Sequence, residues 1–470
     1  MTHLKSSHLN LPDIPFHDTS DEEQVEILQC FLLTYAHFFG DISDTFRDVV
    51  DPRDQPKVIY PLSCLFFTGI LLFTCRLGAR RQTNSDLRGN VPSELKFKSL
   101  FDVDKIPHGD SLNYTFKQLD ADSIQEVVCR LVEQLIRKKL FYSYRLFDRF
   151  YKIVIDGTGM LKFRHRHCKH CLTKKLRDGS TLYYHPVLEA KLVTDNGFAF
   201  SIMTEFIENP GENPTKQDCE LKAFYRLADR LKIRFPHLPI CLLLDGLFAC
   251  GPVFQKIKDN KGWECMIVLT DDDLASVNKA FESLCEQEPI NKLTFWTGRK
   301  KEICQKYRWA NDINYKDSDD NEHVISVLEC TETKPSKNGE EVTTKFKWVT
   351  LFNVTENKVI ELANNGGRLR WKIENEGFNV QKNGGFELEH AYSEDEVSGK
   401  VFYFLLQIAH MLFQLIAKGS LFKKAFPKGV GSLKKIAQRI LEAWRNVRIS
   451  TDNLMLLMRV RVRVSFHDSS

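Results

Sequence analysis

The chain has 470 residues, of which 43% are hydrophobic and 27% charged, a composition typical of a folded globular protein and unlike that of a disordered or fibrous one. A single hydrophobic core usually stops growing below this length, so we expect two or three domains. The formal net charge of +4 is compatible with nucleic-acid binding but does not require it.

The chain contains 13 cysteines, an odd number. Several of them, such as Cys64, Cys241 and Cys265, lie within apolar runs, as buried free thiols do. Residues 1–12 lack the apolar core of a secretory signal. Together these features favour a reducing, cytoplasmic compartment over a disulfide-bonded protein.

The first third of the chain is expected to be helical. Residues 1–21 are predicted to be a flexible N-terminus, and residues 22–145 a helical domain with long apolar-periodic runs. From Tyr151 onward, short β-rich runs alternate with amphipathic segments. This alternation predicts an α/β sheet over residues 146–285.

The next segment, residues 286–360, predicts a β-rich insertion. Strand-like runs follow one another there without a helix between them, at residues 292–298, 323–333, 341–352 and 358–362. Helical periodicity then returns over residues 361–420, and residues 421–470 form a basic C-terminal region.

Two apolar runs, residues 58–75 and 401–418, approach the minimum length of a transmembrane helix. The second carries Gln407, His410 and Gln414 at nearly helical spacing. One polar stripe on an apolar helix is typical of a helix buried in a protein core. We therefore predict two core helices and no membrane span.

Three acids form a candidate metal site. Asp156 and Asp245 each end an apolar strand and precede a glycine, and an acid in that position is costly unless it has a partner or a function. The alternative is that each Asp-Gly pair simply begins a turn. Glu374 follows Arg370 by four residues, so both side chains share one helix face, which also fits a plain salt bridge.

A basic stretch follows the first of these strands. It contains a Cys-x-x-Cys pair, Cys168 and Cys171, among three histidines, and with two of them it could bind zinc. No second Cys-x-x-Cys exists in the chain, so we favour a basic DNA-facing loop over a zinc site. A solvated surface remains the alternative for the basic residues, which are Lys162, Arg164, Arg166, Lys169, Lys174, Lys175 and Arg177.

The segment Arg370-Trp371-Lys372-Ile373-Glu374 resembles a signature of the DDE transposases of bacterial insertion sequences. That signature places Tyr, two residues, Arg, three residues, Glu, six residues and Lys in order. The spacing of the three acids and a β-rich insertion before the third also fit, and the resemblance covers about residues 90–420. Two positions depart from it: Gly367 stands where the tyrosine is expected, and Gln381 where the lysine is expected, with Lys382 one residue late.

The resemblance implies an RNase H-like catalytic domain in which Asp156, Asp245 and Glu374 bind two Mg²⁺ or Mn²⁺ ions. Arg370 and Lys382 would hold the DNA backbone. The implied reaction is excision of an insertion sequence and transfer of its 3′-hydroxyl ends into target DNA, in the bacterial cytoplasm at the nucleoid.

The partners implied are the element's terminal inverted repeats, target DNA and a second copy of the chain. Residues 22–145 would bind the element ends, and residues 390–450 are the candidate for dimer contacts. Trp296 and Trp348 could stack on a flipped base, although a core tryptophan is the commoner use. Two other functions stay open: an RNase H-like nuclease or resolvase without strand transfer, and an inactive DNA-binding descendant.

Overall fold

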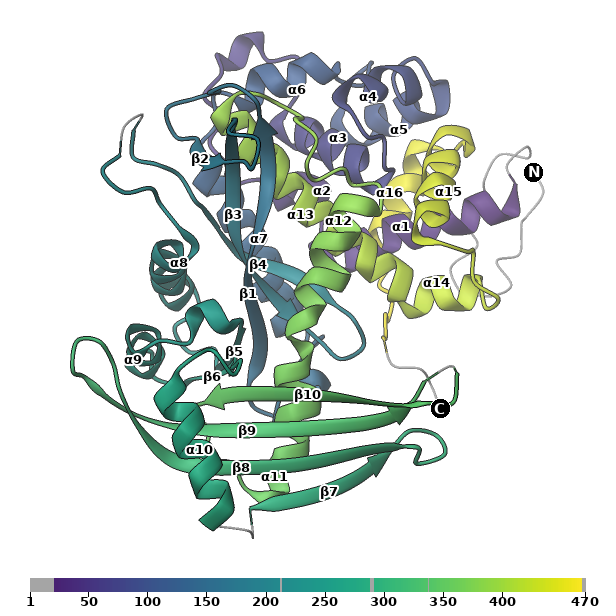
Figure 1. Cartoon of the computed structure of the whole chain (residues 1–470). Helices are drawn as coiled ribbons and strands as arrows, with labels where there is room; N and C mark the ends of the chain where they lie inside the picture. The colour runs from purple at the N-terminus through teal and green to yellow at the C-terminus, as the bar shows by residue number, and fades with distance from the viewer. Residues whose placement is uncertain (1–20, 212–213, 288–290, 337, 467–470) are drawn as a thin grey trace.

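The computed structural model describes residues 21–211, 214–287, 291–336 and 338–466. Its central feature is a ten-stranded mixed sheet in the order β2-β3-β1-β5-β6-β10-β9-β8-β7, with β4 paired to β3 (Figure 1). Helices surround this sheet, so the predicted α/β class is confirmed. The N-terminus predicted to be flexible lies, except for Asp21, outside the described residues.

The first half of the sheet combines antiparallel and parallel strands. β1 (Tyr151–Phe163) pairs antiparallel with β3 (Thr181–Val193), which in turn pairs with β4 (Ala199–Phe206). On its other side β1 pairs in parallel with β5 (Ile240–Leu244), and β5 with β6 (Trp263–Val268). The short β2 (Leu172–Lys175) pairs with the beginning of β3.

The predicted β-rich insertion extends this same sheet. Its strands are β7 (Lys292–Thr297), β8 (Ile303–Lys316), β9 (Glu322–Pro335) and β10 (Glu341–Thr350), and β10 pairs directly with β6. The segment is therefore not a separate layer.

The fourth strand predicted for the insertion, at residues 358–362, is wrong. This segment belongs to α11 (Glu356–Glu361) and the turn that follows it. Val359, Leu362 and Ala363 recur at helical spacing and are buried in the core. A run of three apolar residues is too short to distinguish a strand from a buried helix turn.

Each face of the sheet is covered by different helices. Ile153 and Ile155 belong to the core that includes α8 (Glu220–Arg234) and α9 (Gly251–Asp259). Val154 belongs to the core under a long helical path that runs from α11 to α12 (Asn379–Asn383) (Figure 1). Because side chains alternate between the faces of a strand, Asp156 lies on the face of this second helical path.

The helical path from α11 to α12 is irregular. Residues Leu362–Gly366 form a π-helical turn, Gly367–Trp371 a 3₁₀ turn and Ile373–Phe378 a second π-helical turn. Local departures of this kind often mark functional positions in a helix. Glu374, the third predicted acid, lies in the second π-helical turn.

The remaining helices form one helical layer from both ends of the chain (Figure 1). The N-terminal helices are α1 (Glu22–Phe39), α2 (Ile42–Thr45), α3 (Leu62–Thr74), α4 (Arg80–Asp86), α5 (Val91–Phe101), α6 (Gly109–Phe116) and α7 (Ala121–Arg137). The C-terminal helices are α13 (Glu396–Lys418), α14 (Ser420–Ala425), α15 (Leu433–Asn446) and α16 (Thr451–Arg459). A single further helix, α10 (Ala275–Gln287), packs on β8.

The N- and C-terminal helices share one hydrophobic core. Trp444 of α15 packs edge-on against Phe31 of α1 and Phe97 of α5, and contacts Phe67 of α3. The predicted helical domain of residues 22–145 and the predicted C-terminal region of residues 421–470 therefore share one core.

The two long apolar runs form α3 and α13, both buried in the fold. Among the described residues, α13 alone has the length and apolar character of a membrane span, and 89% of its apolar window is buried inside the protein. Its predicted polar stripe is buried as well: Gln407 accepts a hydrogen bond from Lys191, and Gln414 donates one to the carbonyl of Ala199. Since α13 is covered within the chain, the dimer contacts predicted for residues 390–450 would have to use other residues of this segment.

Candidate active site

Asp156 and Asp245 lie side by side because of the strand register. β1 and β5 run in parallel, with Val154 opposite Leu243. Two residues further along both strands, this register brings Asp156 beside Asp245. Neighbouring strands are about 4.8 Å apart, so both carboxylates can reach a shared cation.

Arg370 joins the two acids. Its Nη2 lies 3.4 Å from Oδ2 of Asp156 and 3.4 Å from Oδ2 of Asp245. The guanidinium is largely buried, and its Nε has no hydrogen-bond partner within the described part of the chain. A cationic side chain therefore already lies between the two carboxylates.

Asp245 lies at the strand end that the sequence predicted for it, whereas Asp156 does not. Asp245 follows the last residue of β5, and its Oδ1 accepts a hydrogen bond from the backbone N–H of Leu247, so it also caps the turn. Asp156 lies within β1, which continues to Phe163, so its assignment to a strand end was wrong. The apolar run ends at Asp156, but pairing with β3 carries the strand onward.

Burial dominates the electrostatics of Asp156. Desolvation raises the pKa of this carboxyl, the Arg370 charge lowers it, and the charges of Asp245 and Glu374 raise it again. The group is therefore easier to protonate than an ordinary aspartate. A bound divalent cation would favour the ionised form.

Glu374 lies on the helical path that carries Arg370. Its side chain is exposed, and its charge is close enough to act on the pKa of Asp156. The structure thus brings the three predicted acids to one region, with Arg370 in contact with two of them and Glu374 at the solvent side.

A fourth acid, Glu220, belongs to this region and was missed by the sequence analysis. A methyl group built on Gly157 would lie 2.2 Å from the Glu220 carboxylate, so this carboxylate packs directly on the β1 backbone. Burial raises the pKa of Glu220, as do the charges of Asp156 and Asp245. The available signal was Gly157 itself, since a glycine inside a strand often marks a close approach.

Gly367, the position of the signature tyrosine, has no room for a side chain. A Cβ at this residue would lie 2.5 Å from atoms of the Trp348 indole. Trp348 is buried and stacks on Phe346 at 6.0 Å. Trp348 is therefore a core residue that fills the space beside Gly367, which is the commoner of the two uses considered for it, and it is not free to stack on a base.

This packing gives a direct test. Replacing Gly367 by tyrosine restores the signature residue but is expected to destabilise the fold by about 1–3 kcal/mol, because the new ring must displace Trp348. The measurement is urea unfolding, with Asn365→Tyr at a neighbouring exposed position as the control. A Gly367→Tyr protein as stable as the control would contradict the packing described here.

The lysine position of the signature is shifted by one residue. Gln381 is fully buried and donates hydrogen bonds to Gln407 at 2.8 Å and to His410 at 3.0 Å. A π-helical turn holds one more residue than an α-helical turn, and such a turn, Ile373–Phe378, contains Glu374 and precedes Lys382. Lys382 therefore takes the position that residue 381 would have in a regular helix.

Lys382 lies beside a second lysine. Its Nζ is 3.6 Å from Oε1 of Glu389, and Nζ of Lys162 is 3.1 Å from the same oxygen. These two lysines come from α12 and β1 and form a positive pair beyond Asp156 along β1.

The other residues predicted to contact DNA are exposed. Trp296 of β7 is 53% exposed, but β7 is five strands from β5, about 24 Å across the sheet. The seven basic residues of the predicted DNA-facing loop are all exposed, at the end of β1 and along β2 and its turn, namely Lys162, Arg164, Arg166, Lys169, Lys174, Lys175 and Arg177.

Cys168 and Cys171 lie close together in the loop between β1 and β2. Their sulfur atoms are 3.8 Å apart, and His185 of β3 lies against both. His185 was not among the predicted ligands, because it is 14 residues from Cys171 in the sequence and comes close to it only through the β2–β3 pairing.

A comparison of the sequence with known protein families gave no match, and a comparison with curated proteins gave none either.

Proposed function

We propose that the chain is a DDE transposase that cuts and joins DNA at the acid site. The observation that carries this proposal is the common register of Asp156 and Asp245 on parallel strands, with Arg370 in contact with both. The arginine lies four residues before Glu374 on the helical path over the same face of the sheet, as in the signature.

The strand order supports the same proposal. We assign β4, β3, β1, β5 and β6 to an RNase H-like catalytic sheet, in which three antiparallel strands are followed by two strands parallel to the central one. The first acid is on the central strand and the second follows its parallel neighbour. The insertion strands β7–β10 extend this sheet beyond β6.

The donor set fits hard divalent cations. Asp156, Asp245 and Glu374 supply carboxylate oxygens, which Mg²⁺ and Mn²⁺ prefer, and Glu220 adds a fourth carboxylate nearby. Two such ions would activate the attacking water or 3′-hydroxyl and stabilise the leaving oxygen.

The basic side chains near the acids would bind DNA rather than metal. Arg370, with an unpartnered Nε, can turn from the carboxylates to a phosphate oxygen once the acids hold metal. Lys162 and Lys382, both paired only with Glu389 among their described ion pairs, can bind the adjacent DNA backbone. These contacts position the phosphate for an in-line displacement.

A single reaction tests the proposal. The purified chain is incubated with Mg²⁺ and the DNA that flanks its coding sequence, with a supercoiled plasmid as the target. Denaturing gels should show cuts at the element ends and a new product joined to the plasmid. Cutting without joining would favour the nuclease or resolvase, and binding without cutting the inactive descendant.

The raised pKa of Asp156 predicts a specific effect on stability. A carboxyl with a raised folded pKa binds its proton more tightly in the fold, so its contribution to stability is lost as pH rises above that pKa. Asp156→Asn should therefore raise the melting temperature of metal-free protein near neutral pH. The gain should shrink towards about pH 4, where the wild-type carboxyl is protonated.

Mg²⁺ should stabilise the wild type and leave the Asp156→Asn variant unchanged. Scanning fluorimetry in excess Mg²⁺ should raise the melting temperature of the wild type but not that of Asp156→Asn, because a ligand stabilises only the state that binds it. An equal response of both proteins to Mg²⁺ would remove Asp156 from the metal site.

A further inference from the structure

Three potential metal ligands converge at the far end of β1 from the acids. The sulfur of Cys168 is 3.8 Å from that of Cys171, and Nε2 of His185 is 3.5 Å from the first and 3.2 Å from the second. All three ligand atoms lie within 4.8 Å of one another. They form a small triangle with its atoms facing one point.

The triangle has the size of a face of a zinc tetrahedron. Zn–S bonds of about 2.3 Å and Zn–N bonds of about 2.0–2.1 Å place two sulfurs about 3.8 Å apart, and a sulfur and a nitrogen about 3.5 Å apart. The observed 3.8, 3.5 and 3.2 Å are close to these edges. An ion therefore fits with a movement of a few tenths of an ångström.

Backbone N–H groups donate hydrogen bonds to both cysteine sulfur atoms. The N–H of His170 donates to Sγ of Cys168 at 3.3 Å, and the N–H of Cys168 donates to Sγ of Cys171 at 3.4 Å. Asn209 holds the loop from the other side by donating from Nδ2 to the carbonyl of Cys171 at 2.8 Å. Contacts of this kind hold metal ligands in a fixed orientation.

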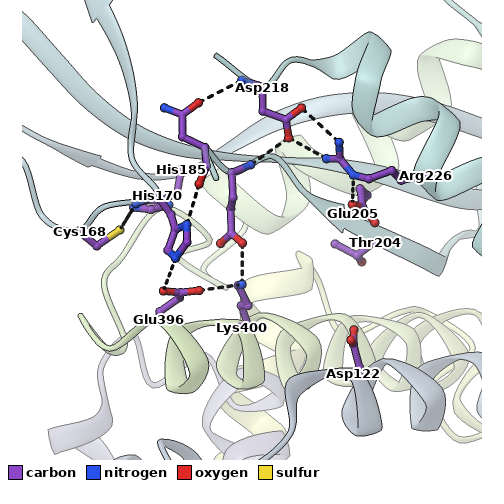
Figure 2. A network of polar contacts seen from close by, with 12 residues as sticks. Asp122, Cys168, His170, His185, Thr204, Glu205, Asp218, Arg226, Glu396 and Lys400 are labelled. Carbon is purple, nitrogen blue, oxygen red and sulfur yellow. Dashed lines mark hydrogen bonds and ion pairs between the residues drawn. The ribbon is translucent and has the colours of Figure 1, made fainter. Parts of the chain in front are cut away.

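The loop is also tied to the sheet and to α13. His170 donates from Nδ1 to the carbonyl of Asn209, and its Nε2 lies 3.6 Å from Glu396 of α13 (Figure 2). Glu396 in turn pairs with Lys400 one turn later in the helix (Figure 2). The cluster thus lies at a junction of β3, the β1–β2 loop and the start of α13.

We propose that Cys168, Cys171 and His185 bind one zinc ion. Two soft sulfur ligands and an imidazole favour zinc over the hard ions of the acid site. A cavity of about 30 Å³ lined by Cys168, His185, His167 and Glu396 adjoins the cluster and has room for a water as a fourth ligand. The ion fastens the loop that carries the basic residues Arg164, Arg166 and Lys169 to β3.

This site is distinct from the acid site. His185 pairs with Leu161, which lies five residues beyond Asp156 on β1, about 17 Å along the strand. Zinc binding can therefore be measured without DNA and independently of any cutting or joining reaction.

The test is the zinc content of the full-length protein. Protein purified without chelator and dialysed against Zn²⁺ is analysed by elemental mass spectrometry, and the wild type should carry one zinc per chain. Cys168→Ser, Cys171→Ser and His185→Gln should each lower this content at least about tenfold. Cys219→Ser, at an exposed cysteine outside the cluster, should keep it.

Cobalt separates loss of ligands from loss of fold. Wild-type protein loaded with Co²⁺ should show an intense thiolate-to-metal band in the near ultraviolet and visible bands typical of tetrahedral coordination. This result would support the site even if the three variants failed to fold.

Three outcomes would overturn the proposal. One is a wild-type protein without zinc and without the cobalt bands. The second is zinc retained by all three variants at the level of Cys219→Ser. The third is an intact mass lighter by two hydrogens with a Cys168–Cys171 peptide crosslink, which would identify a disulfide instead.

Discussion

Replacing Asp156 or Asp245 by asparagine, or Glu374 by glutamine, is expected to lower Mg²⁺-dependent DNA cleavage by at least about a thousandfold. Each change removes one charged ligand of the metal ions, whose stabilisation of the developing charge is worth several kcal/mol. The asparagine side chains keep the shape of the strands, so binding to the same DNA in Mg²⁺-free buffer should persist.

The control for Glu374 is Glu376→Gln. Glu376 lies two residues further along the helix and forms an ion pair with Lys372 at 3.1 Å, so its loss should leave cleavage nearly unchanged. Cleavage is measured as the initial rate on labelled element ends. Full activity in any of the three acid variants would exclude that residue from the metal site.

Replacing Trp444 by alanine is expected to cost about 3–5 kcal/mol of folding free energy, the usual range for removing a fully buried tryptophan. The indole fills the space between Phe31, Phe67 and Phe97, from three helices at the other end of the chain. Its carbonyl also accepts a hydrogen bond from the buried Lys96 of α5 at 2.9 Å. The N-terminal helices therefore depend on α15 for their core.

Chemical unfolding of the full chain measures this effect. Leu433→Ala, at an exposed position in the same helix, is the matched control and should change stability by less than about 0.5 kcal/mol. A Trp444→Ala protein with the stability of this control would show that the C-terminal helices are not part of the N-terminal core.

The strands before the two aspartates could be predicted from the sequence because residues 153–155 and 240–244 are apolar on both faces. The runs before Asp156 and before Asp245 were recognised in this way, and the parallel pairing of β1 with β5 places the two acids side by side. Residues 358–362 were predicted as a strand but are helical, because three apolar residues carry too little periodicity to separate a strand from a helix turn.

The parts of the site that escaped prediction depend on contacts distant in the sequence. Glu220 approaches Asp156 only because α8 packs on β1 at Gly157. His185 reaches Cys168 and Cys171 only through the pairing of β2 with β3. The sequence around Glu220 or His185 contains no pattern that indicates its role. Arg370 and Glu374, in contrast, lie four residues apart on one helix, and this spacing could be recognised in the sequence.

Trp348 is a residue whose position in the sequence was clear but whose role could not be decided from the sequence. An aromatic residue in a β-rich insertion is consistent with stacking on DNA as well as with the commoner packing in a core, and its burial against Gly367 decides between them. The glycine had been noted as a missing tyrosine, but the sequence gave no reason to connect the two positions.

The π-helical turn over Ile373–Phe378 has a consequence for how such chains are recognised. An added residue inside a helix normally rotates everything after it by about 100°, which would turn a downstream lysine away from its site. Here the π-helical turn accommodates the extra residue. The lysine therefore stays on the same side of the helix, although it comes one residue later in the sequence than the signature places it. A search pattern with a fixed count of six residues between glutamate and lysine rejects this chain; one that accepts six or seven retains it.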